Sequence, residues 1–385
     1  MSDLAPPSLD PGDLQGIILR GYNMPLARLF VLQVGSTEGA KRFLRELTSG
    51  NPDAPQITSG AVWTDKPPFC VNLGLTFEGL KALGLPQNSL ASFPPEFSDL
   101  TAGRAAALGD VGESAPETWL PGLNWVDGQP PAAHLLLFLF AQDQPTLNQA
   151  SADLRALFTA GGALTELHVI DGAELPESRV HFGYVDGLSQ PHIAGTAQAD
   201  PLDDDPPAAT GEFLLGYPNQ NGMLYPVPSP TALGHNGAYA AVRILKQDVD
   251  AFEAFLEANA AQMPPLPNVD PKELLAAKIC GRWRNGVPLA LSPETDSPDP
   301  ALTLAQLNHF DYAPSPDFPD ALDDHHGFRC PLGAHMRRCN PRSGPVAGGS
   351  AGLHRVLRRG IPYGPVYDPA HPHDGQERGL FGMFL

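Results

Sequence analysis

The chain has 385 residues, which corresponds to one large domain or two of ordinary size. Its 24 Lys and Arg face 43 Asp and Glu, and the resulting net charge of −19 argues against nucleic acids and anionic membrane surfaces as partners. Four cysteines are too few for a disulfide scaffold. There is no signal-peptide pattern, and the longest apolar run is Leu135–Ala141, so we expect a cytoplasmic protein without a membrane helix.

The first half of the chain alternates predicted strands and helices. Helices are predicted after the capping residues Ser36 and Thr76 and across residues 147–158, because apolar side chains recur there at three- and four-residue intervals. The Gly- and Pro-rich stretch at 86–131 predicts a long loop. Strands are predicted at four apolar runs, namely Leu29–Val34, Phe69–Leu73, Leu135–Ala141 and Leu164–Ile170.

The same alternation restarts in the second half. A strand is predicted at Ala238–Leu245, followed by a helix capped by Asp248 and a second helix at Pro271–Cys280. The chain ends in a predicted strand, Gly379–Leu385. Residues 291–324 are rich in proline and predict a loop.

This double pattern predicts an α+β fold of two similar sandwiches, each of the β-α-β…β-α-β kind. We expect an N-terminal module at 1–197, a linking loop at 198–237 that contains Asp203–Asp205, and a C-terminal module at 238–385. If the two halves are equivalent, a helix and a strand are missing after Gly379–Leu385, so the second module is expected to be short.

The segment Cys330–Arg342 is the first candidate site. Small residues before His335 would let a flat ligand approach the backbone, and the imidazole could then bind a metal axially. Nearby guanidinium groups suit a ligand with carboxylates, and they belong to Arg337, Arg338 and Arg342. Two other interpretations stay open: a helix end with an ordinary histidine, or a zinc site that lacks a fourth ligand, formed by Cys330, His335 and Cys339.

Two further segments carry charged groups at turns. Asp186 stands between Gly183 and Gly187, where the backbone could approach a ligand and the carboxylate could act as a general base. An Asx-turn or a helix-capping aspartate is the alternative. Arg358 and Arg359 precede a rigid turn, and the alternative there is a solvated strand end.

Two clusters of His and Asp could bind a divalent metal. They are Asp323–His326 and His371–Asp374, and both lie in regions that resemble loops. We treat both as weak candidates.

In combination, these segments resemble the dye-decolorizing peroxidases, a family of haem peroxidases. Gly183–Gly187 matches the family's Gly-x-x-Asp-Gly signature, Cys330–Arg342 resembles its proximal-histidine segment, and Arg358–Gly364 resembles the distal-arginine segment that follows. Further matches occur at Gly211–Tyr217 and Gly281–Trp283. The resemblance implies two ferredoxin-like modules, as in a dimeric α/β barrel, with antiparallel sheets covered by helices and with haem b held mainly by the C-terminal module.

The resemblance also implies a role for each matching residue. His335 would be the axial ligand of the haem iron, and Asp186 would move the peroxide proton from one oxygen to the other. Arg358 would stabilise the charge that develops as the O–O bond breaks, with Arg359 as the fallback. Arg342 would bind a haem propionate, and Gly187 would lie against the cofactor.

The implied activity is reduction of hydrogen peroxide and one-electron oxidation of small organic reductants such as dyes and phenols, through an oxyferryl intermediate. A non-enzymatic haem-binding or haem-handling protein is the alternative. A truncated, inactive family member is another, because relatives usually continue through a further helix and strand. The sequence leaves the oligomeric state open, and a homo-oligomer is allowed.

Overall fold

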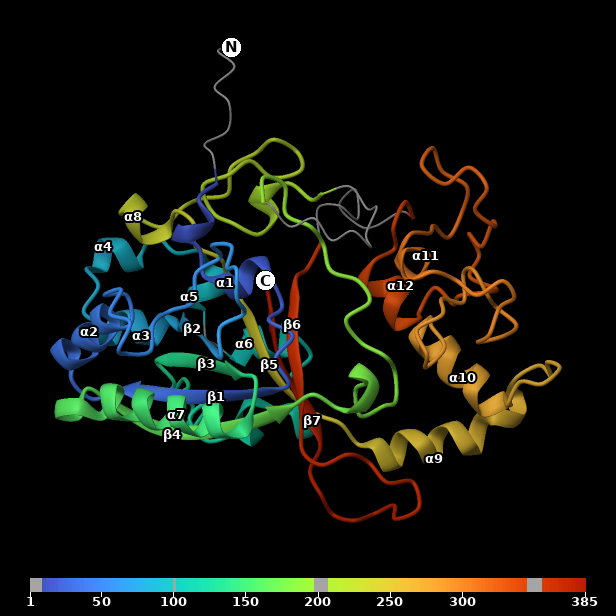
Figure 1. Ribbon diagram of the computed structural model, residues 1–385, viewed down its shortest axis with the longest axis horizontal. Helices are drawn as coiled ribbons and strands as arrows, with labels where there is room; N and C mark the ends of the chain where they lie inside the picture. The colour runs from blue at the N-terminus through green and yellow to red at the C-terminus, as the bar shows by residue number, and fades with distance from the viewer. Residues whose placement is uncertain (1–8, 100–101, 197–206, 345–354) are drawn as a thin grey trace, which may run out of the picture.

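Two antiparallel sheets organise the computed structural model, which describes residues 9–99, 102–196, 207–344 and 355–385 (Figure 1). The first sheet has the strand order β2-β3-β1-β4, and the second has the order β5-β7-β6. The strands are β1 (Leu26–Val34), β2 (Phe69–Leu75), β3 (Leu135–Ala141), β4 (Leu164–Ala173), β5 (Ala241–Lys246), β6 (Arg358–Tyr363) and β7 (Gly379–Phe384).

The first sheet has the ferredoxin-like topology. Helix α2 (Thr37–Glu46) follows β1 and helix α7 (Gln144–Thr159) follows β3, which gives the β-α-β-β-α-β order of that fold. Each helix begins after a capping side chain. The predicted cap Ser36 accepts at Oγ from Gly39 N at 3.3 Å, and Asp143, which the sequence analysis did not name, accepts at Oδ1 from Thr146 N at 2.8 Å. The predicted alternation of the first half is therefore confirmed.

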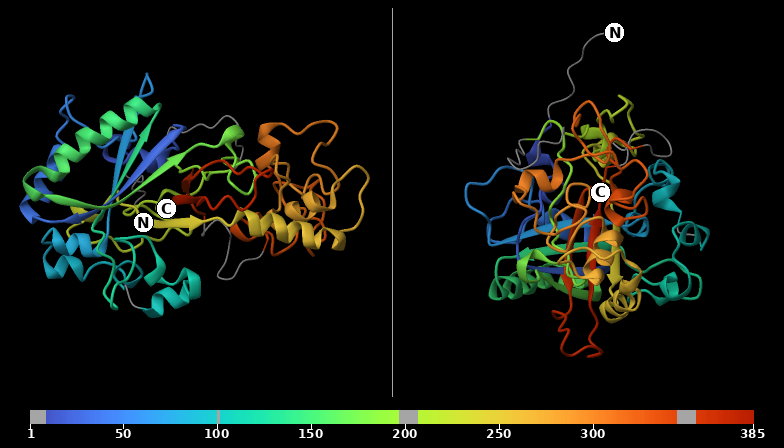
Figure 2. Two further views of the ribbon diagram at one scale, coloured as in Figure 1. Left: turned by 90° about the horizontal axis from the view of Figure 1, so that it is seen from below. Right: turned by 90° about the vertical axis from the view of Figure 1, so that its right-hand side faces the viewer.

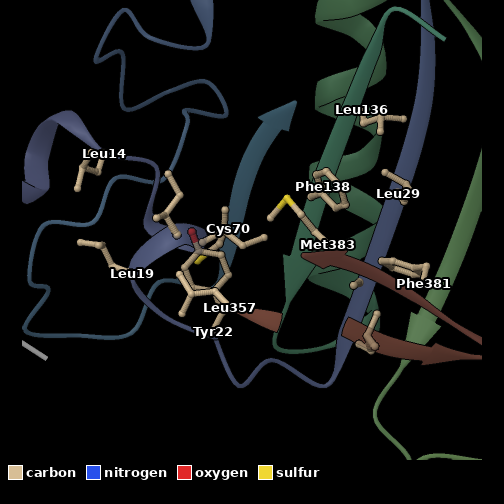
Figure 3. Packing of buried hydrophobic residues seen from close by; sticks show 14 of the residues in the cluster. Leu14, Leu19, Tyr22, Leu29, Cys70, Leu136, Phe138, Leu357, Phe381 and Met383 are labelled. Atoms are coloured by element: carbon tan, nitrogen blue, oxygen red, sulfur yellow. The ribbon is translucent and has the colours of Figure 1, made fainter. Parts of the chain in front are cut away.

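The two faces of the first sheet pack against different partners, because side chains alternate along a strand. Phe30 of β1 belongs to a core shared with Phe43 of α2 and Phe158 of α7. The neighbouring Leu29 belongs to a second core that includes Phe381 of β7. Figure 3 shows this second core, in which strands of both sheets meet. The packing of sheet against sheet fixes how the second half sits on the first.

The second sheet has the same arrangement as the first three strands of the first sheet. Its strands β5, β6 and β7 take the places of β1, β2 and β3, so that the third strand lies between the first and the second. Helix α9 (Val249–Asn259) follows β5, and α10 (Pro271–Cys280) follows α9. Within the described residues, β7 lies in the centre, with β5 and β6 on either side. Figure 2 shows α9, α10 and the orange segment beyond them extending away from the first sheet.

Some boundaries differ from the sequence-based expectation. Strand β6 was not predicted, and β5 starts at Ala241 rather than Ala238. The predicted loop at 86–131 contains the short helices α4 (Gln87–Leu90), α5 (Pro95–Ser98) and α6 (Ala102–Ala107). Helices of four to six residues are too short to show a repeating apolar pattern in the sequence. The remaining α-helices are α1 (Gly16–Leu19), α3 (Phe77–Ala82), α8 (Thr231–Gly234), α11 (Leu304–Asn308) and α12 (His335–Cys339).

The predicted division into modules stays a prediction. Residues 198–206 of the expected linker lie outside the described residues. In the parts of the chain that the structure describes, no helix has the length and apolar character needed to cross a membrane.

Candidate active site

His335 is the first residue of α12, a helix of only five residues. Its side chain is exposed. Gly333 lies just before it, and a Cβ added at Gly333 would meet no atom within 4 Å. The backbone at Gly333 is therefore open to close approach, and the role of His335 as a ligand stays a prediction.

A buried ion pair anchors this short helix. Arg337 Nη1 donates to Asp324 Oδ2 at 3.0 Å and to the Cys330 carbonyl at 2.6 Å, while Nη2 donates to the Asp324 carbonyl at 2.8 Å. Both side chains are buried. The same carboxylate accepts from the backbone N–H groups of Arg329 and Cys330, at 2.8 and 2.9 Å. Asp324 thus ties the turn before His335 to the helix that carries it.

The weak metal clusters of the sequence do not assemble. The carboxylate of Asp324 is taken up by the ion pair and the two backbone donors described above. In the second cluster, His371 Nδ1 and His373 Nδ1 lie 2.7 Å from Asp368 and 3.2 Å from Asp250, respectively, as separate surface pairs. Among the described residues, no group of three or more His, Cys, Asp or Glu is arranged to hold a metal ion, which also removes the support for the zinc interpretation.

Asp186 lies in an exposed turn between two glycines with positive φ angles, 86° at Gly183 and 78° at Gly187. The turn is fixed by its backbone, since Val185 N donates to the Arg284 carbonyl and Asp186 N to the Ser178 carbonyl, both at 2.9 Å. A Cβ at Gly187 would meet nothing within 4 Å. The carboxylate of Asp186 has no hydrogen-bond partner among the described residues, so it is available to a ligand.

Arg358 is held beside this turn at the start of β6. Its Nη2 donates to the Ser189 carbonyl at 2.6 Å, and its backbone N–H donates to Gln190 Oε1 at 3.0 Å. The strand that carries Arg358 is therefore tied to the segment that carries Asp186, although the two lie more than 170 residues apart.

Arg359 points to a different part of the molecule. Its Nε and Nη2 donate to the carbonyls of Ile17 and Ile18 in α1, at 2.7 and 3.0 Å. Burial lowers the pKa of this guanidinium to about 10. The hydrogen bonds occupy Arg359 as a link between β6 and the N-terminal helix, which favours Arg358 over the fallback.

Three of the predicted site residues, His335, Asp186 and Arg358, interact electrostatically. Contact with Cys339 Sγ raises the pKa of His335, with ring nitrogens 3.8 and 3.9 Å from the sulfur. The charge of Arg358 lowers the pKa of this ring and the charge of Asp186 raises it. The fold therefore brings together side chains from the turn at 183–187, from α12 and from β6.

Arg342 lies over an aromatic ring close by. Its Cζ is 3.8 Å from the centroid of Phe310, which is almost completely buried, and its Nη2 donates to Asn308 Oδ1 at 3.3 Å. Arg282 approaches the same ring, with Cζ 5.7 Å from its centroid. The sequence did not single out Arg282, although it stands inside the Gly281–Trp283 match.

The thiols give a testable consequence of this environment. Burial raises the pKa values of Cys70 and Cys330 to about 11, whereas Cys339 is exposed and contact with His335 lowers its pKa. Because the thiolate is the reactive form, we expect a maleimide at pH 8 to label Cys339 about 100-fold faster than Cys330. Peptide mass spectrometry of the labelled chain measures this, and preferential labelling of Cys330 would contradict the described burial.

A cavity of about 370 Å³ is lined in part by residues 175–183. Its lining includes His181, Gly183 and Arg284 but none of Asp186, Arg358 or His335. This cavity is therefore distinct from the neighbourhood described above.

Comparisons with known proteins find relatives that match most of the chain. The chain is 29% identical over 367 residues to a dye-decolorizing peroxidase of Mycena epipterygia and 31% identical over 360 residues to peroxidase 2 of Mycetinis scorodonius. A solved dye-decolorizing peroxidase in complex with 2,6-dimethoxyphenol matches 98% of this chain with a TM-score of 0.75 and 26% identity, and the match covers 81% of that structure. No model of a protein family matches.

Over almost its whole length the chain is similar to dye-decolorizing peroxidases in sequence and in fold. The similarity covers 93% and 92% of this chain but only 65% and 64% of these two relatives, so the chain spans slightly under two thirds of their length. The structural match confirms the predicted α+β fold of dye-decolorizing peroxidases, with antiparallel sheets and helices.

A haem cofactor is implied because dye-decolorizing peroxidases are haem enzymes. The residues present fit that group. An exposed imidazole offers the nitrogen that haem iron takes as an axial ligand. Arg342 and Arg358 supply positive charge for the carboxylates of the cofactor. Gly187 and Gly333 have no side chain, and a Cβ at either position would meet no atom within 4 Å, so neither residue obstructs a ligand there.

Proposed function

We propose that this chain is a haem peroxidase that reduces hydrogen peroxide and oxidises small organic reductants. The observation that carries the proposal is the attachment of Arg358 to the segment that carries Asp186, through the hydrogen bonds to Ser189 and Gln190. The charges of both side chains also act on His335. The names of its relatives support the same activity.

Each side chain has a chemical task in this proposal. His335 holds the iron of haem b, which supplies the redox chemistry when bound. Asp186 accepts a proton from one oxygen of hydrogen peroxide and delivers it to the other, a task suited to an exposed carboxylate without a competing partner. Arg358 places a fixed positive charge where negative charge develops on the peroxide oxygens. Arg342 binds a propionate, and Gly187 leaves space for the macrocycle.

Phenols are the proposed reductant class, together with dyes. A structurally similar dye-decolorizing peroxidase is known in complex with 2,6-dimethoxyphenol, which makes that compound the natural first reductant to supply. A cytoplasmic location, a homo-oligomeric state and the module boundaries at 197 and 238 rest on the sequence alone and stay predictions.

Titration of the purified chain with haemin tests the proposal. We expect one equivalent to give a sharp Soret band, and one equivalent of hydrogen peroxide to shift that band within the mixing time. His335→Ala should abolish the sharp band, and added imidazole should restore part of it by taking the vacated axial position. A stoichiometric band that does not respond to peroxide would favour the non-enzymatic haem-binding alternative, and no uptake would favour an inactive family member.

A further inference from the structure

Arg282 is a buried guanidinium whose hydrogen bonds are only partly made. It follows α10 directly and is 7% exposed. Its Nη1 donates to the carbonyls of Gly286 and Leu307, at 2.8 and 2.6 Å. Its Nε and Nη2 donate to no acceptor among the described residues, and neither belongs to the fully enclosed atoms that lack a partner. The Nε–Nη2 edge is the side of a guanidinium that grips a carboxylate with two parallel bonds, so a binding edge is left unused.

The surroundings of Arg282 are positive. Its guanidinium and that of Arg342 approach the same Phe310 ring, 5.7 and 3.8 Å from the centroid. The pKa of Arg282 is lowered to about 10, mainly by burial, and the charges of Arg342 and Arg358 contribute to that lowering. In the described parts of the chain, the guanidinium groups of Arg282 and Arg358 donate only to backbone carbonyls and pair with no carboxylate.

Positive charges held this close repel each other, and a buried charge without a counter-ion is unfavourable. An anion that reached both Arg282 and Arg342 would relieve both penalties. Such an anion must be flat or slender enough to lie beside Phe310. Both guanidinium groups lie against this aromatic ring, so a ligand that carries two carboxylates could pair with one guanidinium through each carboxylate.

We propose that Arg282 is a second anchor for the carboxylates of haem, with its Nε and Nη2 gripping one propionate while Arg342 serves the other. This inference rests on the proposed function and deepens it. It assigns a positioning role to a residue of the Gly281–Trp283 segment, which lies 53 residues before His335. The anchor acts on affinity and orientation, because Arg282 touches the carboxylate edge of the cofactor and not the peroxide.

The test compares haemin with its dimethyl ester, in which both carboxylates are uncharged. Arg282→Met should weaken haemin binding by about 10- to 100-fold, the range expected for hydrogen bonds to a charged group. It should change the affinity for the dimethyl ester by less than about 3-fold. Dissociation constants come from absorbance titrations of the apoprotein in the Soret region. Arg45→Met is the matched control, since it removes an exposed arginine of α2, a helix that contributes no residue to the site, and should leave both affinities unchanged.

A purely structural role for Arg282 gives a different result. Loss of the bonds to the Gly286 and Leu307 carbonyls would weaken haemin and the dimethyl ester equally, and that result would overturn the anchor. Arg282→Lys keeps the charge but loses the two-pronged grip, so its haemin affinity should fall between those of the wild type and Arg282→Met. This variant decides the question if Arg282→Met does not fold. Binding of haemin that is equally tight in all variants would overturn the anchor alone, whereas no binding to the wild type would overturn the proposed function with it.

Discussion

Replacement of Asp186 by Asn should slow the reaction of the haem-loaded chain with hydrogen peroxide by about 10²- to 10⁴-fold, the usual contribution of a positioned general acid–base group. The amide keeps the size of the side chain but cannot accept and return a proton. Asp186 is suited to this variant because its side chain makes no hydrogen bond to the described protein, so the substitution removes no structural contact. Stopped-flow absorbance at increasing peroxide concentration gives the second-order rate constant.

The matched control is Asp153→Asn on helix α7, whose carboxylate only accepts from Gln149 at the protein surface. This variant should react with peroxide at the wild-type rate. The haemin affinity of Asp186→Asn should also equal that of the wild type, which separates proton transfer from cofactor binding. A rate constant for Asp186→Asn within a factor of about three of the wild type would assign the proton transfer to another group.

Arg337→Met should lower the free energy of unfolding by about 3–5 kcal/mol, the typical effect of removing one partner from a buried ion pair. The reason is the buried carboxylate of Asp324, which keeps its two backbone donors but loses its counter-ion. Because α12 has only five residues, it depends on this pair for its position. We therefore also expect weaker haemin binding through a displaced His335. Urea denaturation followed by circular dichroism measures the change.

The neighbouring residue provides the control for this prediction. Arg338 is exposed on the same helix, and Arg338→Met should change the free energy of unfolding by no more than about 0.5 kcal/mol. The double variant Asp324→Leu/Arg337→Met should be less destabilised than the sum of the single variants, because it leaves no unpaired buried charge. Equal destabilisation by Arg337→Met and Arg338→Met would show that the buried pair does not anchor α12.

Much of the fold could be predicted because its signals are local. The apolar runs of β1 and β3 and the capping side chains Ser36 and Asp248 are signals contained within a few neighbouring residues. Strand β6 escaped prediction because Arg358, Arg359 and Gly360 have little strand propensity, and its pairing with β7 supplies the hydrogen bonds that stabilise it.

The candidate site shows the same division. The sequence by itself determined the residue types and their order: a histidine after small residues, an aspartate between glycines, and an arginine before a rigid turn. The tertiary structure decided which of Arg358 and Arg359 faces the site, since successive side chains of a strand point to opposite faces and only the packing of β6 against α1 assigns the faces. It also made Asp324 an anchor rather than a metal ligand, and it placed Arg282 and Arg342 against the same ring, that of Phe310. These roles depend on contacts between residues far apart in the chain, and such contacts leave no periodic signal in the sequence.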